Sequence, residues 1–235
     1  MAKGVIYVMN TCVDGLVKIG KTRTDRFENR MAFLEKNGYR RIGVLTRTFA
    51  IEVEDYSEKE KLIHEIFSKS RVGDTELFSI DVNLVMQLMA SMDGRIIYPE
   101  EENKIQIFEQ ATEVIQSRQG VIPDGIYKLK VKNTKTKGYL TAEMQMKAGV
   151  ITVKKGAKLG DVTTISSKAL RKKREDLRIE NNTLMEDFEC EAPSPAATII
   201  LGHNTNGWQV WKNVNGEVID VYRKQEAEES GEIEE

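Results

Sequence analysis

Two short apolar runs near the N-terminus constrain the fold more than any other feature of the chain. The runs GVIYVM (4–9) and GLVKIGK (15–21) alternate at the period of a β-strand, and Asp14-Gly15 lies at their junction. An Asp-Gly pair between two such runs is a strong signal for a tight turn. We therefore expect a β-hairpin, and with it an antiparallel sheet.

The residues after this hairpin alternate between helical and strand patterns. Helical periodicity is expected over 24–38, 57–70 and 82–92, and strands over 41–51 and 76–80. The helix over 57–70 has Leu62, Ile63, Ile66 and Phe67 as its expected buried stripe. Short strands interleaved with helices predict an α+β domain over residues 1–98, a small antiparallel sheet flanked by helices.

The composition changes after Pro99, which indicates a second part of the chain. An acidic helix is expected in 99–120, with Ile105, Phe108 and Ile115 on one stripe. It could connect two domains, packing on either of them or on its copy in a homodimer. A smaller C-terminal α+β domain is expected over 121–224, where strand runs surround a basic helix (166–178) and a short helix leads to a Trp-bearing hairpin (194–222). The acidic tail 225–235 has no apolar stripe and is expected to be disordered.

Charge and composition exclude several classes of protein. No run of about 18 apolar residues and no signal-peptide core occurs, so we expect a cytoplasmic protein without a membrane partner. Cys12 and Cys190 are far apart and only two histidines are present, which excludes a Cys/His zinc cluster, so any metal would be held by carboxylates. The net charge of −2 hides a segment 121–224 of net charge +6. Such a segment suits a polyanion, or is a solvated basic face.

The hairpin brings a tyrosine and a lysine together. Successive side chains of a strand point to opposite faces, so pairing Ile6 and Val8 with Val17 and Ile19 in the core places Tyr7 beside Lys18 on the other face. Gly20 on that face lets another group approach closely. A solvent-exposed Tyr-Lys pair would produce the same pattern.

Five segments, in their order and spacing, resemble a GIY-YIG nuclease domain over residues 3–92. They are VIY at 5–7, KIGK at 18–21, Arg30, EKLIH at 60–64 and TELF at 75–78. The resemblance is to the phage-type branch, in which a lysine commonly replaces the second tyrosine. It implies a small antiparallel sheet flanked by helices and the metal-dependent hydrolysis of a DNA phosphodiester.

The resemblance also assigns roles to single residues. Tyr7 would orient or deprotonate the attacking water, Lys18 would favour the phenolate, and Lys21 would assist. Arg30 would neutralise charge on the scissile phosphate, and Glu76 would be the one protein ligand of Mg²⁺ or Mn²⁺. Outside the family, Arg30 would be a surface arginine and Glu76 an ordinary carboxylate at a strand edge.

His64 lies four residues after Glu60 on the expected second helix, so the carboxylate could fix the orientation of the imidazole. The resemblance implies that His64 positions water or shuttles a proton. The alternative is a structural histidine on a helix.

Four further segments lie in the C-terminal part: VKKGAKL at 153–159, LRKKREDL at 170–177, SPAATIILG at 194–202 and NGWQVWKNVNGEVID at 206–220. On these segments, residues 124–224 resemble the domain of unknown function called RAMA, which often follows GIY-YIG domains and adenine methylases. The association implies DNA binding, with modified bases as one kind of target. Trp208 and Trp211 are three residues apart and cannot share a face of one strand, so Trp208 would stack on a base, or both would be structural. Phosphates would be contacted by the basic run of the helix, namely Arg171, Lys172, Lys173 and Arg174.

The sequence thus predicts a DNA endonuclease that depends on Mg²⁺ or Mn²⁺, acts in restriction or phage defence, and carries a C-terminal domain for DNA binding or targeting. Two alternatives stay open. The chain could be a DNA-binding protein that keeps the nuclease fold without catalysis, or a nuclease of repair or of a mobile element.

Overall fold

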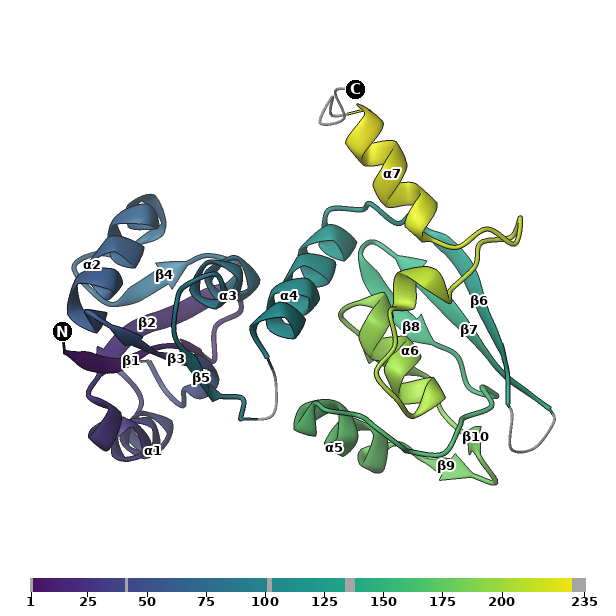
Figure 1. Ribbon diagram of the computed structural model, residues 1–235, viewed down its shortest axis with the longest axis horizontal. Coiled ribbons are helices and arrows are strands. Elements are labelled where there is room, and N and C mark those ends of the chain that lie inside the picture. The colour runs from purple at the N-terminus through teal and green to yellow at the C-terminus, as the bar shows by residue number, and fades with distance from the viewer. Residues whose placement is uncertain (1, 41, 101–102, 134–137, 230–235) are drawn as a thin grey trace. The chain divides into compact units, whose positions relative to one another are not determined.

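The computed structural model describes residues 2–40, 42–100, 103–133 and 138–229. The chain divides into two compact units, 1–111 and 112–235, which are described separately below (Figure 1). Each unit combines helices with an antiparallel sheet, which confirms the α+β class.

The first unit is built on a five-stranded antiparallel sheet in the order β4-β2-β1-β3-β5. The expected hairpin is present as β1 (Lys3–Asn10) and β2 (Leu16–Thr22), with Val8 opposite Ile19. The other strands are β3 (Thr46–Glu54), β4 (Leu77–Ser79) and β5 (Arg95–Tyr98). Strand β5 pairs with the edge of β3 and was not predicted from the sequence.

Helices cover both faces of this sheet. Ile6, Val8, Val17 and Ile19 form a core with α2 (Tyr56–Ile66) and α3 (Val82–Ala90) on one face. Val5, Tyr7 and Met9 form a second core with α1 (Phe27–Asn37) on the other (Figure 1). The strand alternation was therefore predicted correctly, but the face that holds Tyr7 is buried, so the alternative of a solvent-exposed Tyr-Lys pair is wrong.

The predicted stripe of α2 is wrong for two of its four residues. Leu62 and Ile66 are exposed, whereas the buried positions of the helix are Glu60 and Ile63. Glu60 takes an inward position because its carboxylate binds groups at the sheet, as described below. A hydrophobic pattern could not reveal this, since it gives an acidic residue an outward position.

Helix α4 (Lys104–Arg118) contains the point at which the two units divide. Its predicted stripe is wrong for two of its three residues, because Ile105 and Phe108 are exposed and Ile115 is half-buried, while Ile107, Ala111 and Val114 are buried. The buried residues recur at intervals of four and three, which is the spacing of a single helix face.

The second unit contains a four-stranded antiparallel sheet in the order β11-β8-β7-β6. Its strands are β6 (Gly125–Lys132), β7 (Tyr139–Lys147), β8 (Val150–Val153) and β11 (Phe188–Cys190), and β9 (Ile179–Glu180) pairs with β10 (Thr183–Leu184) beside it. Helix α6 (Pro193–Leu201) contributes to the core on one face of the sheet. Helix α5 (Lys168–Asp176) is the expected basic helix.

The C-terminal part differs from the expectation at two places. Trp208 lies in a short 3₁₀ turn (Gly207–Gln209) rather than in a hairpin. Helix α7 (Asp220–Glu229) extends into the tail for which we expected disorder, and positions 230–235 lie outside the described residues.

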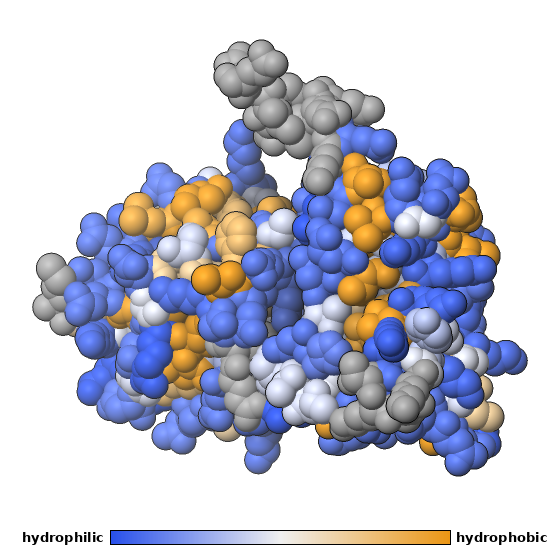
Figure 2. All heavy atoms as spheres, turned by 45° about the vertical axis from the view of Figure 1, so that its right-hand side comes forward, coloured by the Kyte–Doolittle hydropathy of each residue, from blue (hydrophilic) through white to orange (hydrophobic). Residues whose placement is uncertain are grey.

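The surface visible in Figure 2 is mostly hydrophilic, with apolar residues in separate patches. In the part of the chain that the structure describes, no helix combines the length and the apolar character needed to cross a membrane.

Candidate active site

The hairpin positions Tyr7 against a strand position that has no side chain. Tyr7 of β1 lies opposite Gly20 of β2, and Met9 lies opposite Lys18. A Cβ atom at Gly20 would stand 2.7 Å from the Tyr7 hydroxyl oxygen and 2.8 Å from Lys18 Nζ. Gly20 therefore allows these two polar groups to converge on the backbone of β2. The sequence predicted a close approach at Gly20, but not that these two side chains would be the groups that make it.

Lys18 is completely buried and has several stabilising contacts. Its ammonium forms an ion pair with the Glu76 carboxylate and lies 4.4 Å from the ring centroid of Tyr39 and 5.3 Å from that of Tyr7. Burial lowers the pKa of Lys18, and the nearby Glu76 carboxylate opposes that shift. An unpaired ammonium at this depth would be costly, so Glu76 compensates for the burial of Lys18.

Glu76 reaches Lys18 because β2 and the start of β4 run side by side. The Ile19 N–H donates to the Glu76 carbonyl at 3.0 Å, and Lys18 lies opposite Leu77. The Glu76 side chain is 34% exposed, so the carboxylate faces both the buried lysine and solvent.

Arg30 completes this group from α1, one helical turn before the buried Leu34. Its Nε donates a hydrogen bond to the Tyr7 hydroxyl oxygen at 3.3 Å. Burial raises the pKa of Tyr7 and the Arg30 guanidinium counteracts this, with burial the larger effect. Tyr7 is thus a protonated hydroxyl at neutral pH, whose oxygen accepts from Arg30 and whose own hydrogen can be donated. We call Tyr7, Lys18, Arg30 and Glu76 the tyrosine cluster.

A second group, the Glu60 cluster, consists of Lys21, Glu60 and His64. Lys21 Nζ lies 3.1 Å from Glu60 Oε2, and His64 Nε2 lies 3.7 Å from Glu60 Oε1. His64 Nε2 also lies 3.2 Å from the Ile19 carbonyl oxygen. A carbonyl can only accept, so Nε2 carries the hydrogen. Burial lowers the pKa of His64, which favours the neutral imidazole.

The structure therefore connects the predicted residues through β2. Ile19 links the two clusters, because its N–H binds the Glu76 backbone and its carbonyl binds His64. The predicted proximity of Glu60 and His64 is present. Sequence reasoning missed the Lys21–Glu60 ion pair and the contact of Tyr39 with Lys18. Tyr39 follows the end of α1 at Gly38, and no pattern in the sequence distinguishes it from other loop aromatics.

The donor set limits which metal the cluster could hold. Within the described residues, no group of three or more His, Cys, Asp or Glu side chains is placed to bind a metal ion. Glu76 offers a hard carboxylate oxygen at a partly exposed position. One carboxylate with water and phosphate oxygens suits Mg²⁺ or Mn²⁺, whereas structural zinc requires more nitrogen or sulfur ligands.

Two DNA-contact predictions for the second unit are wrong. Arg174 is buried and its guanidinium donates to the carbonyl oxygens of Ile199, near the end of α6, and of Gly160, in the loop after β8, so it satisfies backbone groups rather than phosphates. Trp208 is completely buried and cannot stack on a base.

The remaining residues of the basic run are accessible to different extents. Lys172 and Lys173 are exposed, whereas Arg171 is half-buried and donates to the Ser166 carbonyl at 3.4 Å. Trp211 is buried as well, and its Nε1 donates to the Pro193 carbonyl at 3.1 Å. The alternative that both tryptophans are structural is thus supported.

Comparisons with known proteins agree with the division of the chain into two units. Residues 4–93 match the T5orf172 domain, a nuclease-like, phage-associated domain. Residues 129–223 match a domain of unknown function, DUF4357. Neither the curated proteins nor the solved structures contain a match to the chain. The similarity of the first unit makes a nuclease or DNA-binding role plausible.

Proposed function

We propose that the first unit is a metal-dependent DNA endonuclease of the GIY-YIG type, and that the second unit binds or targets DNA. The observation that carries the proposal is the fully buried Lys18, paired with the partly exposed Glu76 beside Tyr7 and Gly20. A hydrophobic residue in place of a buried ion pair is often neutral or stabilising. A fold therefore gains little from such a pair, and a catalytic site is one setting that uses it.

Arg30 is the phosphate-binding residue in this proposal. One of its nitrogens is engaged by Tyr7, and the planar guanidinium has further donors for a phosphate oxygen. Held there, it would neutralise the negative charge that develops as the phosphodiester bond is attacked.

Tyr7 would act on the attacking water. Its pKa is raised by burial, so the free protein presents a hydroxyl that can orient water through a hydrogen bond. Removing its proton needs additional positive charge nearby, and the Lys18 ammonium and the Arg30 guanidinium supply part of it.

Glu76 would hold the Mg²⁺ or Mn²⁺ ion, which when bound supplies Lewis-acid stabilisation of the phosphate oxygens. The ion pair with Lys18 fixes the position of the carboxylate. Lys21 is the accessible member of the Glu60 cluster, with its side chain 36% exposed, and can contact a phosphate of the bound strand, while neutral His64 keeps the backbone of β2 in place.

The raised pKa of Tyr7 also favours a second candidate, a DNA-binding protein that keeps this fold without turnover, because a buried hydroxyl is a poor base. For the catalytic protein we propose a role in restriction or phage defence, supported by the phage-associated domain that the first unit matches. A substrate such as damaged DNA would instead indicate repair.

The test is cleavage by the purified chain of single-stranded, duplex and base-modified DNA, with Mg²⁺, with Mn²⁺ and with EDTA. Glu76→Gln is expected to abolish cleavage and to keep DNA binding, because it removes the metal ligand and leaves the basic second unit intact. Glu58→Gln, an exposed position on α2, is the matched control for the lost charge. Equal cleavage by Glu76→Gln and the parent would refute the site, and binding without cleavage in every condition would support the non-catalytic candidate.

A further inference from the structure

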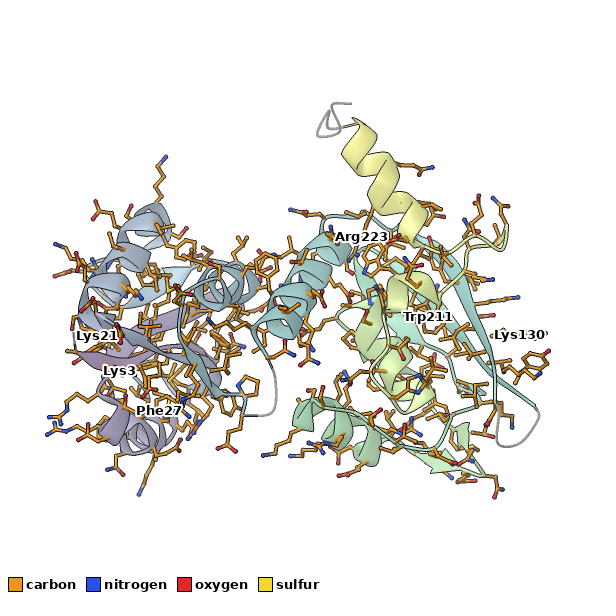
Figure 3. The ribbon with its side chains drawn as sticks, in the orientation of Figure 1. Lys3, Lys21, Phe27, Lys130, Trp211 and Arg223 are labelled. Atoms are coloured by element: carbon orange, nitrogen blue, oxygen red, sulfur yellow. The ribbon has the colours of Figure 1, made fainter. Side chains whose placement is uncertain are left out.

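The solvent-facing side of the sheet in the second unit carries a row of lysines. Along β6, Tyr127 and Leu129 point into the core. The alternate residues Lys128, Lys130 and Lys132 point to the other face and are exposed. Lys130 projects from the side of the β6-β7 pair that is away from α6 (Figure 3).

A fourth lysine joins this row from a distant part of the chain. Lys128 and Lys212 exchange both backbone hydrogen bonds, with N···O distances of 2.8 and 2.9 Å. Residues that pair in this way lie directly opposite each other, with side chains on the same face. Lys212 is exposed. We call Lys128, Lys130, Lys132 and Lys212 the lysine face.

Little negative charge balances the lysine face. The residues of β7 that lie opposite the three β6 lysines are Glu143, Thr141 and Tyr139. Glu143 is the acidic member of this set, and Lys130 Nζ lies 4.6 Å from the ring centroid of Tyr139. The four lysines and Glu143 have a net charge of +3. Like charges placed opposite each other destabilise a sheet, so this arrangement is best accounted for by an anionic partner.

We propose that the lysine face binds the phosphate backbone of duplex DNA. This inference rests on the proposed function for the choice of DNA as the partner. Residues two apart on a strand are about 6.8 Å apart, so the three β6 lysines span about 14 Å, roughly four base-pair steps. Lysines act as point charges and would hold the duplex without reading its sequence.

The face fits a duplex better than a single strand. Single-strand binding surfaces stack successive bases on several aromatic side chains. Among the described residues of β6, β7, β8 and β11, Tyr139 is the aromatic side chain on this face, while Tyr127 and Phe188 are in the core. The duplex presents its phosphates outward and needs no such platform.

The measurement is the salt dependence of binding to a fluorescent 20-base-pair DNA by the full chain, in EDTA, from 50 to 200 mM salt. Lys130→Gln/Lys132→Gln removes two exposed charges from the lysine face. Lys172→Gln/Lys173→Gln removes two exposed charges from α5, the phosphate contact that the sequence predicts, and serves as the competing site. Lys130→Arg/Lys132→Arg keeps the charge and tests whether the fold tolerates change at these positions.

We expect the Gln pair on the lysine face to reduce the slope of log K against log salt by about 1.8, because each phosphate contact contributes about 0.9. The parent would then lose ~12-fold more affinity than this variant over the salt range. The Arg pair should keep the parental slope, and the α5 pair should lower it less than the lysine-face Gln pair does.

Three results would overturn the inference: an unchanged slope for the lysine-face Gln pair, a larger change for the α5 pair, or tighter binding of a polyglutamate peptide than of DNA to this face. Cleavage by the parent with Mg²⁺ or Mn²⁺ is measured separately. A lowered slope without parental cleavage would refute the nuclease and keep the lysine face, whereas cleavage with an unchanged slope would refute the lysine face alone.

Discussion

Removing Glu76 should destabilise the first unit far more than removing Lys18, although the two residues form one ion pair. Lys18 has no exposed side-chain surface, whereas the Glu76 side chain is 34% exposed. Glu76→Ala leaves an ammonium inside the protein, and breaking a buried pair in this way costs about 3–5 kcal/mol. Lys18→Met leaves a carboxylate that water can reach.

The remaining contacts set the expected magnitudes. In Glu76→Ala, the ring of Tyr39 still contacts the Lys18 ammonium, and this contact offsets roughly 1 kcal/mol of the cost of breaking the ion pair. We therefore expect a loss of about 2–4 kcal/mol, or roughly 8–16 °C in the melting temperature of a unit of this size. Lys18→Met keeps the length and the apolar stem of the side chain and should change stability by no more than about 1.5 kcal/mol in either direction.

The pH dependence distinguishes the two variants as well. Burial lowers the pKa of Lys18 below its ordinary value of 10.5. Between the lowered pKa and 10.5, the unfolded chain holds a proton that the folded chain has lost, so stability rises with pH. Glu76→Ala removes the carboxylate that opposes the shift and extends this window to lower pH. The stability that Glu76→Ala loses relative to the parent should therefore shrink between pH 7 and pH 9.5. Lys18→Met should show no such recovery.

The assay is thermal unfolding followed by near-ultraviolet circular dichroism, in EDTA so that metal binding plays no part. Glu58→Ala, at an exposed position of the same unit, controls for the loss of one carboxylate. Equal losses in Glu76→Ala and Lys18→Met, or a larger loss in Lys18→Met, would show that Lys18 is not desolvated and would refute the reasoning.

Three further predictions concern single residues. Gly20→Ala should lower cleavage by about 10²-fold, because its Cβ displaces the Tyr7 hydroxyl or Lys18 Nζ; unchanged single-turnover rates would contradict the packing. Arg30→Lys should lower the cleavage rate by about 10²-fold or more while the melting temperature stays near the parent's, since the charge remains but the planar fork is lost. Trp208→Ala should cost about 3–5 kcal/mol in urea unfolding of the second unit, whereas weaker DNA binding at unchanged stability would restore the stacking role.

Much of the first unit could be predicted because its signals are local. The Asp14-Gly15 turn and the alternation of its flanking runs predicted the hairpin and the side-by-side placement of Tyr7 and Lys18. The TELF motif predicted that the Glu76 carboxylate lies in the same site as Tyr7 and Lys18. The ion pair between Glu76 and Lys18 shows that it does.

Predictions that depended on burial were less successful. Leu62 and Ile66 lie on an apolar stripe of α2 yet are exposed, while Glu60 is buried because it binds Lys21. In the second unit, Arg174 belongs to a basic run but is buried against backbone carbonyls. The burial of Glu60 and of Arg174 depends in each case on a partner at least 14 residues away in the chain.

The sequence by itself determined the hairpin and most helices and strands of the first unit, the α+β class and which residues share a face of the hairpin, because side-chain periodicity and turn chemistry act over a few neighbouring residues. Only the tertiary structure decided which faces are covered. The packing of α1 over the Tyr7 face buried Lys18, the packing around α6 buried Trp208, and the other face of the β6-β7 pair remained open with its lysines. The free energy of a charged or aromatic side chain depends on this long-range environment, and its role follows from the environment rather than from the residue type alone.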